Sequence, residues 1–195
     1  MKLSKLSKLP HLLMLHVKLK RFGVNYGKNI RGNRVSLKNN GQINIGDRVS
    51  LNSFPAGEMS KTGLHCHCKE SVITIGNDCN LNGFMVHCRT SVSIGDYCMF
   101  GPGSKIIDND SHRITTDIKE RREAPESAPV TLEENVWVGM NSLILKGVTI
   151  GKNSIVAAHS VVTKPVPENV LVGGIPAKII KTLDAADEKS RDELT

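Results

Sequence analysis

The sequence predicts an all-β solenoid whose coils have flat sides of six residues each. Aliphatic residues recur at every sixth position over the C-terminal half of the chain, at Leu132, Val138, Ile144, Ile150, Val156 and Val162. Four residues after each of them stands a small or β-branched residue: Val136, Ser142, Val148, Ser154, Ser160 and Val166. Neither the period of an ordinary strand nor that of a helix produces this pattern. Aromatic residues make up only 4% of the chain, as expected for a narrow interior filled by aliphatic and small side chains.

The same frame recurs upstream in shorter pieces. These are Val24 and Ile30, Ile45 and Leu51, Ile75 and Leu81, and the series Ile94, Phe100 and Ile106. The frame slips by one residue between Leu81 and Ile94, and it is interrupted at about 53–71 and 111–129. We expect both interruptions to be loops, and loops on a rigid scaffold are where function concentrates. An ordinary antiparallel β-sandwich is the competing fold.

The N-terminal segment is strongly basic. Residues 1–46 hold ten Lys or Arg and no acidic residue. We expect residues 1–22 to form an amphipathic segment that packs Leu12, Leu15 and Leu19 on the body with its lysines in solvent. The alternative is that this segment meets an anionic membrane surface or a lipid-linked, phosphorylated substrate.

The repeat divides the chain into three parts. A β-helix domain is expected over 23–182, after the basic segment 1–22 and before an acidic C-terminal tail or short helix over 183–195. No apolar run approaches the roughly 20 residues of a membrane span. The N-terminus also lacks a small-residue cleavage site, so we predict a cytoplasmic protein, at most at the inner face of the membrane.

The cysteines and the histidines between them suggest packing rather than chemistry. The five cysteines are Cys66, Cys68, Cys79, Cys88 and Cys98, and an odd number without a signal peptide predicts reduced thiols. Cys79 and Cys98 occupy the small, inward position of the repeat. The run His65-Cys66-His67-Cys68 differs from a zinc-finger pair, whose ligands are two to four residues apart. We therefore assign the run to the first insertion loop and expect no metal.

Six short motifs follow one another in order over about residues 70–182. They are Ile94-Gly95-Asp96, Asp108-Asn109-Asp110-Ser111-His112, Val136-Trp137-Val138-Gly139, Gly147-Val148-Thr149-Ile150-Gly151, Ser160-Val161-Val162-Thr163-Lys164 and Gly174-Ile175-Pro176-Ala177-Lys178. In this order they resemble the hexapeptide-repeat acyltransferases, most closely the sugar O-acetyltransferases of the galactoside, maltose and polysaccharide type. The resemblance implies a left-handed parallel β-helix that uses acetyl-CoA as its acyl donor.

The resemblance places the catalytic histidine at His112. The chemistry agrees, because acetyl transfer from a thioester to an alcohol needs a base near neutrality to take the hydroxyl proton. Asp110, or Asp108 before it, is expected to orient the imidazole or stabilise its cation. Direct transfer in a ternary complex is implied, so Cys88 is not expected to act as a nucleophile.

The donor-binding residues follow from the C-terminal motifs through the same resemblance. Backbone groups of successive coils would hold the pantetheine arm, and lysines would hold the phosphates of coenzyme A as point charges. The lone Trp is expected to line the active site rather than to pack in the interior. The implicated residues are Trp137, Gly139, Met140, Ala157, Ala158, Thr163, Lys164, Lys178 and Lys181, with Lys178 standing where many relatives carry Arg.

Acceptor binding is assigned to fewer residues. Asn82 lies near the place where relatives contact the acceptor with an Asn, although the slip in the frame complicates that correspondence. His87 lies on a coil side near the expected active site, and Arg121 lies on the loop that would cross its mouth. The resemblance also implies a homotrimer whose sites form between neighbouring subunits.

Together these observations predict an acetyl-CoA-dependent O-acetyltransferase acting on a hydroxyl of a sugar or of a surface-polysaccharide precursor. An N-acetyltransferase for an amino sugar nucleotide is the alternative. A non-catalytic or metal-binding β-helix is a further one, but its carbonic-anhydrase-like form needs three histidine ligands. His65, His67, His87 and His112 do not show the expected spacing. The basic N-terminus lacks interleaved aromatic residues and any nucleic-acid-binding module, so no nucleic-acid partner is expected.

Overall fold

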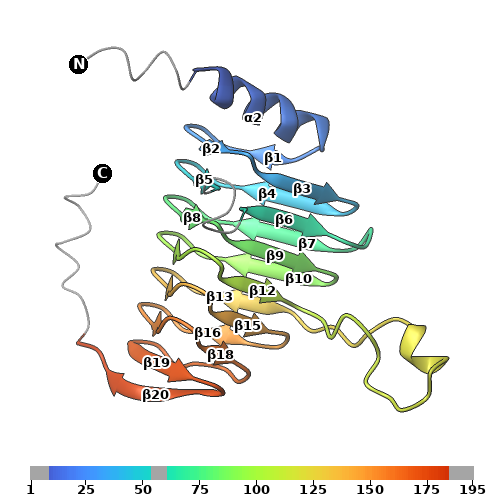
Figure 1. The fold of residues 1–195 in the computed structure, drawn as a ribbon. Helices are drawn as coiled ribbons and strands as arrows, with labels where there is room; N and C mark the ends of the chain where they lie inside the picture. Colours follow the sequence, from blue (N-terminus) through green and yellow to red (C-terminus); the bar gives the residue numbers. More distant parts are fainter. Residues whose placement is uncertain (1–8, 54–60, 185–195) are drawn as a thin grey trace.

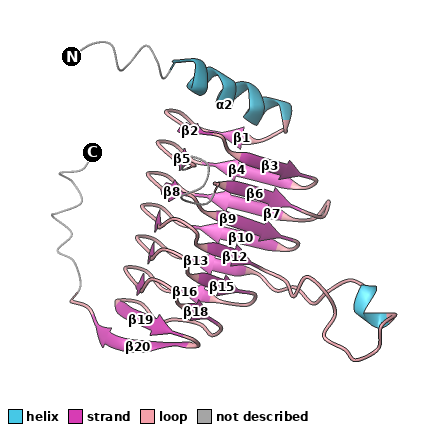
Figure 2. Cartoon of the chain, viewed as in Figure 1, coloured by secondary structure: helices cyan, strands magenta, loops and turns pink. Residues whose placement is uncertain are grey.

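Parallel strands stack along one axis into a three-sided prism (Figure 1). The computed structural model describes residues 9–53 and 61–184, with side chains from Leu12 onward. Helix α2 (Leu9–Arg21) lies over one end of the prism, and β19 (Val170–Gly174) and β20 (Ala177–Thr182) lie at the other. Figure 2 shows that strands and tight turns make up nearly all of the structure between them.

Three sheets form the faces of the prism. Sheet A contains β1 (Asn25–Tyr26), β4 (Gln42–Ile45), β7 (Val72–Ile75), β10 (Ser91–Ile94), β13 (Val130–Leu132) and β16 (Thr149–Ile150). Sheet B contains β2 (Arg31–Asn33), β5 (Ser50–Asn52), β8 (Asn80–Asn82), β11 (Met99–Phe100), β14 (Trp137–Val138), β17 (Ile155–Val156), β19 and β20. Sheet C contains β3 (Ser36–Asn39), β6 (Gly63–Cys66), β9 (Met85–Cys88), β12 (Lys105–Ile107), β15 (Leu143–Leu145) and β18 (Val161–Val162).

The chain visits sheets A, B and C in turn and then returns to sheet A one level further along the axis. Over the described residues this path makes six complete coils. Every ladder is parallel except the one between β19 and β20. The prediction of a left-handed parallel β-helix is confirmed, and the antiparallel sandwich is excluded.

The aliphatic positions of the repeat point into the prism, as predicted. Leu132, Val138, Ile144, Ile150, Val156 and Val162 are all buried. The ladders place these residues directly above one another, since Val138 pairs with Phe100 on one side and Val156 on the other. The interior is therefore a continuous aliphatic column, and burial of that column is the main favourable term in folding.

The one-residue slip in the frame is the net of two changes: the step from Leu81 to Val86 is five residues, one short of the repeat, and the step from Val86 to Ile94 is eight, two more than the repeat. Leu81 is in register with Phe100, and Val86 is in register with Ile106. The corner between β8 and β9 is therefore one residue shorter than the corner between β11 and β12. Phe84 fills this corner from within, fully buried, with its ring centroid 4.1 Å from that of Phe100.

The two interruptions differ from each other. Residues 54–60 lie outside the described residues, but Gly63–Cys66 is a strand paired on both sides, with β3 and with β9. The expectation of a loop over about 53–71 is therefore wrong in its second half, because the backbone of that half is held in the ladder of sheet C. Residues 108–129 do leave the prism between β12 and β13, and they carry one 3-10 turn, η1 (Glu120–Arg122), far from the body (Figure 1).

Helix α2 closes the N-terminal end of the aliphatic column. Leu15 and Leu19 are buried against the first coil, and Lys18 Nζ donates a hydrogen bond of 2.6 Å to the carbonyl oxygen of Val35. Leu12 is 36% exposed, so the packed face is narrower than expected. The part of the chain that the structure describes contains no helix with the length and apolar character needed to cross a membrane.

The C-terminal end is closed differently from the prediction. Strand β20 folds back antiparallel on β19 to form a hairpin. The hairpin does not follow the six-residue period, so the period could not predict it. Most of the acidic tail or short helix expected over 183–195 falls on residues 185–195, which lie outside the described residues.

Truncating the column should cost far more stability than truncating the projecting loop. Ile144 is fully buried, and we expect Ile144→Ala to lower the free energy of unfolding by about 2–5 kcal/mol. Ile114 is 82% exposed on the loop, and Ile114→Ala should change the same quantity by no more than about 0.5 kcal/mol. Urea unfolding of both variants measures this, and equal losses would contradict the assignment of the core.

Candidate active site

Sheet C ends at two corners of the prism, and the predicted site residues divide between them. The B–C corner, where the chain passes from sheet B to sheet C, contains residues 139–142 and 157–160. The C–A corner, where it passes from sheet C to sheet A, contains residues 108–129 and 163–165. Because the parallel strands stack in register, residues of one corner line up along the prism axis.

Asp108 anchors the loop that carries His112. Its buried carboxylate accepts hydrogen bonds from the backbone N of Arg89 at 2.8 and 3.0 Å, the backbone N of Thr90 at 2.7 Å and Asn109 Nδ2 at 2.9 Å. Hydrogen bonds to an ionised acceptor are stronger than neutral ones. The carboxylate thus fastens the first residues of the loop to the turn of the coil beneath.

The two ends of the loop are also fastened to each other. Ala128 N donates to the carbonyl oxygen of Asp108 at 2.9 Å, and Asp110 N donates to that of Glu126 at 3.1 Å. Lys146 Nζ donates to the carboxylate oxygens of Asp110 at 2.5 Å and of Glu126 at 3.0 Å. These two carboxylates raise the pKa of Lys146, which therefore stays charged and bridges both ends of the loop.

His112 follows a sharp turn at the start of this loop. Ser111 N donates to Asn109 Oδ1 at 2.9 Å, His112 N donates to the carbonyl oxygen of Asp110 at 2.7 Å, and Ser111 adopts the left-handed φ of 65°. The His112 side chain is exposed. Within the described part of the chain neither preceding carboxylate bonds to its imidazole, because that of Asp110 is held by Lys146. Both carboxylates act on the loop rather than on the ring.

A half-open hollow of about 260 Å³ lies beside this turn. It is lined by His67, His87, Arg89, Ile107, Asn109 and Ser111. Ring nitrogens, a guanidinium, an amide and a hydroxyl surround one aliphatic side chain, which suits a small polar ligand. His87 is the only predicted substrate contact among the lining residues. The others went unrecognised because the repeat pattern does not specify which corner residues share a column.

Three histidine side chains meet on the outer face of sheet C. His65 pairs with His87 in the β6–β9 ladder, and His67 follows His65 by two residues. Nε2 of His67 lies 3.1 Å from Nδ1 of His87, and Nε2 of His65 lies 2.9 Å from Ser36 Oγ. Burial is the main cause that lowers the pKa of each of the three, and nearby positive charge lowers it further. The period-two alternation of the His-Cys run was the overlooked signal, since it places both histidines on one face of a strand.

The B–C corner is tightly packed. A Cβ on Gly139 would lie 2.6 Å from the backbone N of Ala158, so only glycine allows this approach of successive coils. The backbone N–H groups of Gly139 and Ala157 donate within the ladder, to Val156 and Val172 respectively. Neither residue therefore has a backbone N–H left to offer a ligand. Met140 and Ala158 are exposed at the surface of the corner.

Trp137 lies on the outer face of sheet B, next to the B–C corner. Its side chain is 51% exposed, and it is flanked in the ladder by Met99 and Ile155. The ring is therefore outside the aliphatic column, on the exposed surface of sheet B.

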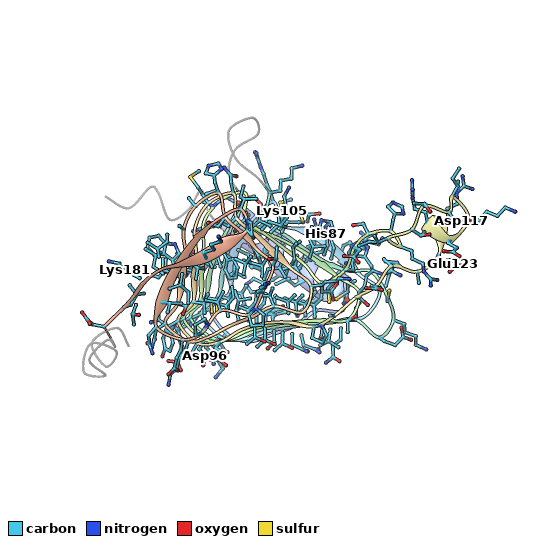
Figure 3. All side chains as sticks on the ribbon, turned by 90° about the horizontal axis from the view of Figure 1, so that it is seen from below. His87, Asp96, Lys105, Asp117, Glu123 and Lys181 are labelled. Atoms are coloured by element: carbon cyan, nitrogen blue, oxygen red, sulfur yellow. The ribbon has the colours of Figure 1, made fainter. Side chains whose placement is uncertain are left out.

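The predicted phosphate contacts are spread around the prism. Thr163 and Lys164 are exposed at the C–A corner, whereas Lys178 and Lys181 are exposed on β20. Viewed along the axis in Figure 3, Lys181 lies on the side of the prism away from His87 and from the projecting loop. A single chain does not bring all the predicted donor residues and His112 into one site.

The other two predicted acceptor residues are also apart from the hollow. Asn82 is the last residue of β8 and lies at the B–C corner. It is in register with Asn52 of the preceding coil, whose Nδ2 donates a hydrogen bond of 3.2 Å to Asn82 Oδ1. It precedes the shortened corner, so the slip in the frame does not displace it. Arg121 lies in η1 at the loop tip, where its guanidinium donates to the carbonyl oxygen of Thr115 at 3.0 Å.

The inward cysteines form stacked pairs within the column. Cys66 lies in register with Cys88, and Cys79, Cys88 and Cys98 are all buried. Contact with the Cys66 thiol and burial raise the pKa of Cys88, and the Cys98 thiol and burial do the same for Cys79. Cys88 therefore stays a buried, protonated thiol, which is a poor nucleophile.

The fold and the corner motifs define a class of protein, the β-helices built from hexapeptide repeats. Residues 129–164 match the family described as bacterial transferase hexapeptide (six repeats). The predicted resemblance to the hexapeptide-repeat acyltransferases is thereby confirmed. The matched segment contains every predicted donor residue except Lys178 and Lys181.

Two curated relatives match parts of the chain. The chain is 39% identical over 103 residues to a galactoside O-acetyltransferase of Lactococcus lactis subsp. lactis, a match covering 53% of this chain and 49% of the relative. It is 51% identical over 71 residues to a 2,3,4,5-tetrahydropyridine-2,6-dicarboxylate N-acetyltransferase of Clostridium perfringens, covering 36% of this chain and 29% of the relative. The chain thus spans about half the length, or less, of these curated relatives.

A solved structure is similar over more of the fold. It is a hexapeptide-repeat containing acetyltransferase from Vibrio cholerae O1 biovar eltor, complexed with acetyl coenzyme A. The TM-score is 0.58 at 26% identity, and the match covers 88% of this chain and 78% of that one.

The anchoring role of Asp108 can be tested against a matched aspartate. Asp117 also accepts backbone N–H groups, from Lys119 and Glu120, but it lies exposed in the loop. We expect Asp108→Asn to lower the free energy of unfolding by about 1–3 kcal/mol, because the buried donors lose their charged acceptor. Asp117→Asn should change it by at most about 0.5 kcal/mol. Urea unfolding of both variants is the measurement, and equal effects would refute the anchor.

Proposed function

We propose that this chain is an acetyl-CoA-dependent O-acetyltransferase for a hydroxyl of a sugar or of a surface-polysaccharide precursor. The observation that carries the proposal is the position of His112 beside the polar hollow, on a loop whose ends are held by Asp108 and Lys146. Support comes from the local identity to a galactoside O-acetyltransferase and from the structural neighbour complexed with acetyl coenzyme A.

In the proposed reaction His112 acts as a general base. Its free ring nitrogen takes the proton of the acceptor hydroxyl while that oxygen attacks the thioester carbonyl carbon. The carbon–sulfur bond then breaks, the acetyl group leaves on the acceptor oxygen, and the coenzyme A thiolate is protonated by the imidazolium. No acyl-enzyme is needed, in keeping with the buried state of Cys88. Asp110 serves as a positioning residue, since it holds the turn before His112 through Lys146.

The donor is proposed to lie along the B–C corner, with its arm near Trp137, Gly139, Met140, Ala157 and Ala158. The exposed side chains of Thr163, Lys164, Lys178 and Lys181 would meet its phosphates. Since the B–C corner and the lysines of β20 lie away from His112 on one chain, we propose a homotrimer. In a closed ring of identical chains, one face of each chain meets a different face of the next.

The acceptor is proposed to occupy the hollow, in contact with His87. Asn82 would reach it from the B–C corner of a neighbouring chain, and Arg121 would do so from the tip of the projecting loop. A cytoplasmic location, a place in polysaccharide biosynthesis and contact of the basic N-terminus with a membrane surface stay predictions.

An N-acetyltransferase is the second candidate, favoured by the 51% local identity to the dicarboxylate N-acetyltransferase of Clostridium perfringens. The two candidates differ in the acceptor atom. Parallel assays of hydroxyl and amino sugars with acetyl-CoA decide between them, and acetylation of amines alone would overturn the proposed O-acetylation.

The role of His112 predicts a split between turnover and binding. His112→Ala should lower kcat by ~10²–10⁴-fold, the usual contribution of a placed base. The affinity for acetyl-CoA and the unfolding midpoint should stay unchanged, because the exposed ring packs on nothing in the core. Ile114→Ala on the same loop is the matched control and should keep full activity.

The measurement is steady-state kinetics with donor binding by calorimetry. Full activity of His112→Ala on a sugar acceptor would contradict the assignment and make His87 the next candidate for the base.

A further inference from the structure

The three-histidine group of sheet C has an arrangement that acetyl transfer with His112 as the base does not require. His65 and His87 stand side by side in the β6–β9 ladder, and His67 lies on the same face at the end of β6. One ring nitrogen from each residue can be chosen so that all three atoms lie within 4.8 Å of one another. The three rings come from two adjacent strands of a rigid sheet, so their backbone positions are set by the ladder.

These distances are close to those of a metal site. A zinc ion bound at about 2.0–2.1 Å by each imidazole places tetrahedral ligand nitrogens about 3.3 Å apart. His67 Nε2 and His87 Nδ1 already lie 3.1 Å apart. The His65 ring lies edge to face with the His87 ring, 5.2 Å apart between centroids. Its Nε2 contact with Ser36 Oγ, at 2.9 Å, would hold the ring in place if Nδ1 became the ligand.

The histidine cluster lies among charged side chains. The charged groups that act on the cluster are Lys38, Arg89 and Lys105, with Asp108 opposing them at His67. Figure 3 shows Lys105 on the same side of the prism as His87.

Of these three positive side chains, Lys38 opposes a bound cation most directly. Its Nζ lies 3.4 Å from His67 Nδ1, and an ammonium can only donate, so Nδ1 accepts and the proton of the neutral ring sits on Nε2. Binding of a metal at Nε2 would need the other tautomer and would break this long contact. Lys38 is exposed, so its ammonium is free to swing into solvent.

We propose that His65, His67 and His87 form a binding site for one divalent transition-metal ion such as zinc. Imidazole ligands suit zinc, cobalt, nickel and copper, whereas magnesium and calcium prefer oxygen. Two of the three rings line the hollow, so the fourth coordination position faces it and is open to water or to an oxygen of a small ligand. This proposal does not rest on acetyl transfer, since it concerns metal affinity alone.

The test is titration of the purified, chelator-treated full chain with Co²⁺, followed by visible absorption, and with Zn²⁺ by competition. We expect one ion per chain and a tetrahedral Co²⁺ spectrum. His67→Gln and His87→Gln should each weaken binding by more than about 100-fold, because loss of a ligand exceeds the effect of losing an outer partner. Lys38→Ala should strengthen it by about two- to tenfold.

His159→Ala is the matched control, because His159 is exposed at the other corner, and it should bind as tightly as the unaltered chain. Circular dichroism and the unfolding midpoint establish that each Gln variant is folded. Absence of one-to-one binding in the unaltered chain would overturn the proposal. So would binding that persists in folded His67→Gln and His87→Gln, or that His159→Ala weakens equally.

Discussion

The rest of the structure depends on the requirement that one aliphatic side chain per six residues sits on its counterpart in the next coil. Val138 lies between Phe100 and Val156, and the same stacking runs through every described coil. Because the parallel strands are in register, the residues next to the core positions also lie above one another in successive coils. Asn82, Gly101, Gly139 and Ala157 each follow a stacked core residue and so share one corner. Functional groups on this protein are therefore organised as columns.

The same constraint explains how a projecting loop holds His112, the proposed base, firmly. The chain leaves the prism at Asp108, and the buried carboxylate there binds the turn below while Lys146 ties the loop ends together. His112 needs no side-chain partner of its own, because its backbone turn is fixed on both sides. The distal part, around η1, is held only by contacts within the loop, such as that of Arg121 with Thr115. Rigidity is concentrated where the chemistry is proposed.

The fold could be predicted from the sequence because the period of six has one structural solution and recurs without a break from Leu132 to Val162. The histidine cluster could not be predicted in the same way, because the ladder partner of β6 depends on the number of residues between β5 and β6 and on the short corner at Phe84. The His65-Cys66-His67-Cys68 run was assigned to a loop since no aliphatic residue in frame marked it. The contact of Asp110 also differs from the expected one with the His112 imidazole. Lys146, which is distant in sequence, donates a hydrogen bond to the Asp110 carboxylate.

The central claim is that the His112 loop and the B–C corner of different chains make one site. Mixing His112→Ala with Ala158→Trp, a bulky change at an exposed corner position, tests it most directly. Each variant alone should be inactive, and trimers mixed one to one should regain about a quarter of the sites, since the intact halves meet only when the right neighbours adjoin. No recovery in trimers shown by mass spectrometry to be mixed, or full activity of Ala158→Trp alone, would contradict the account.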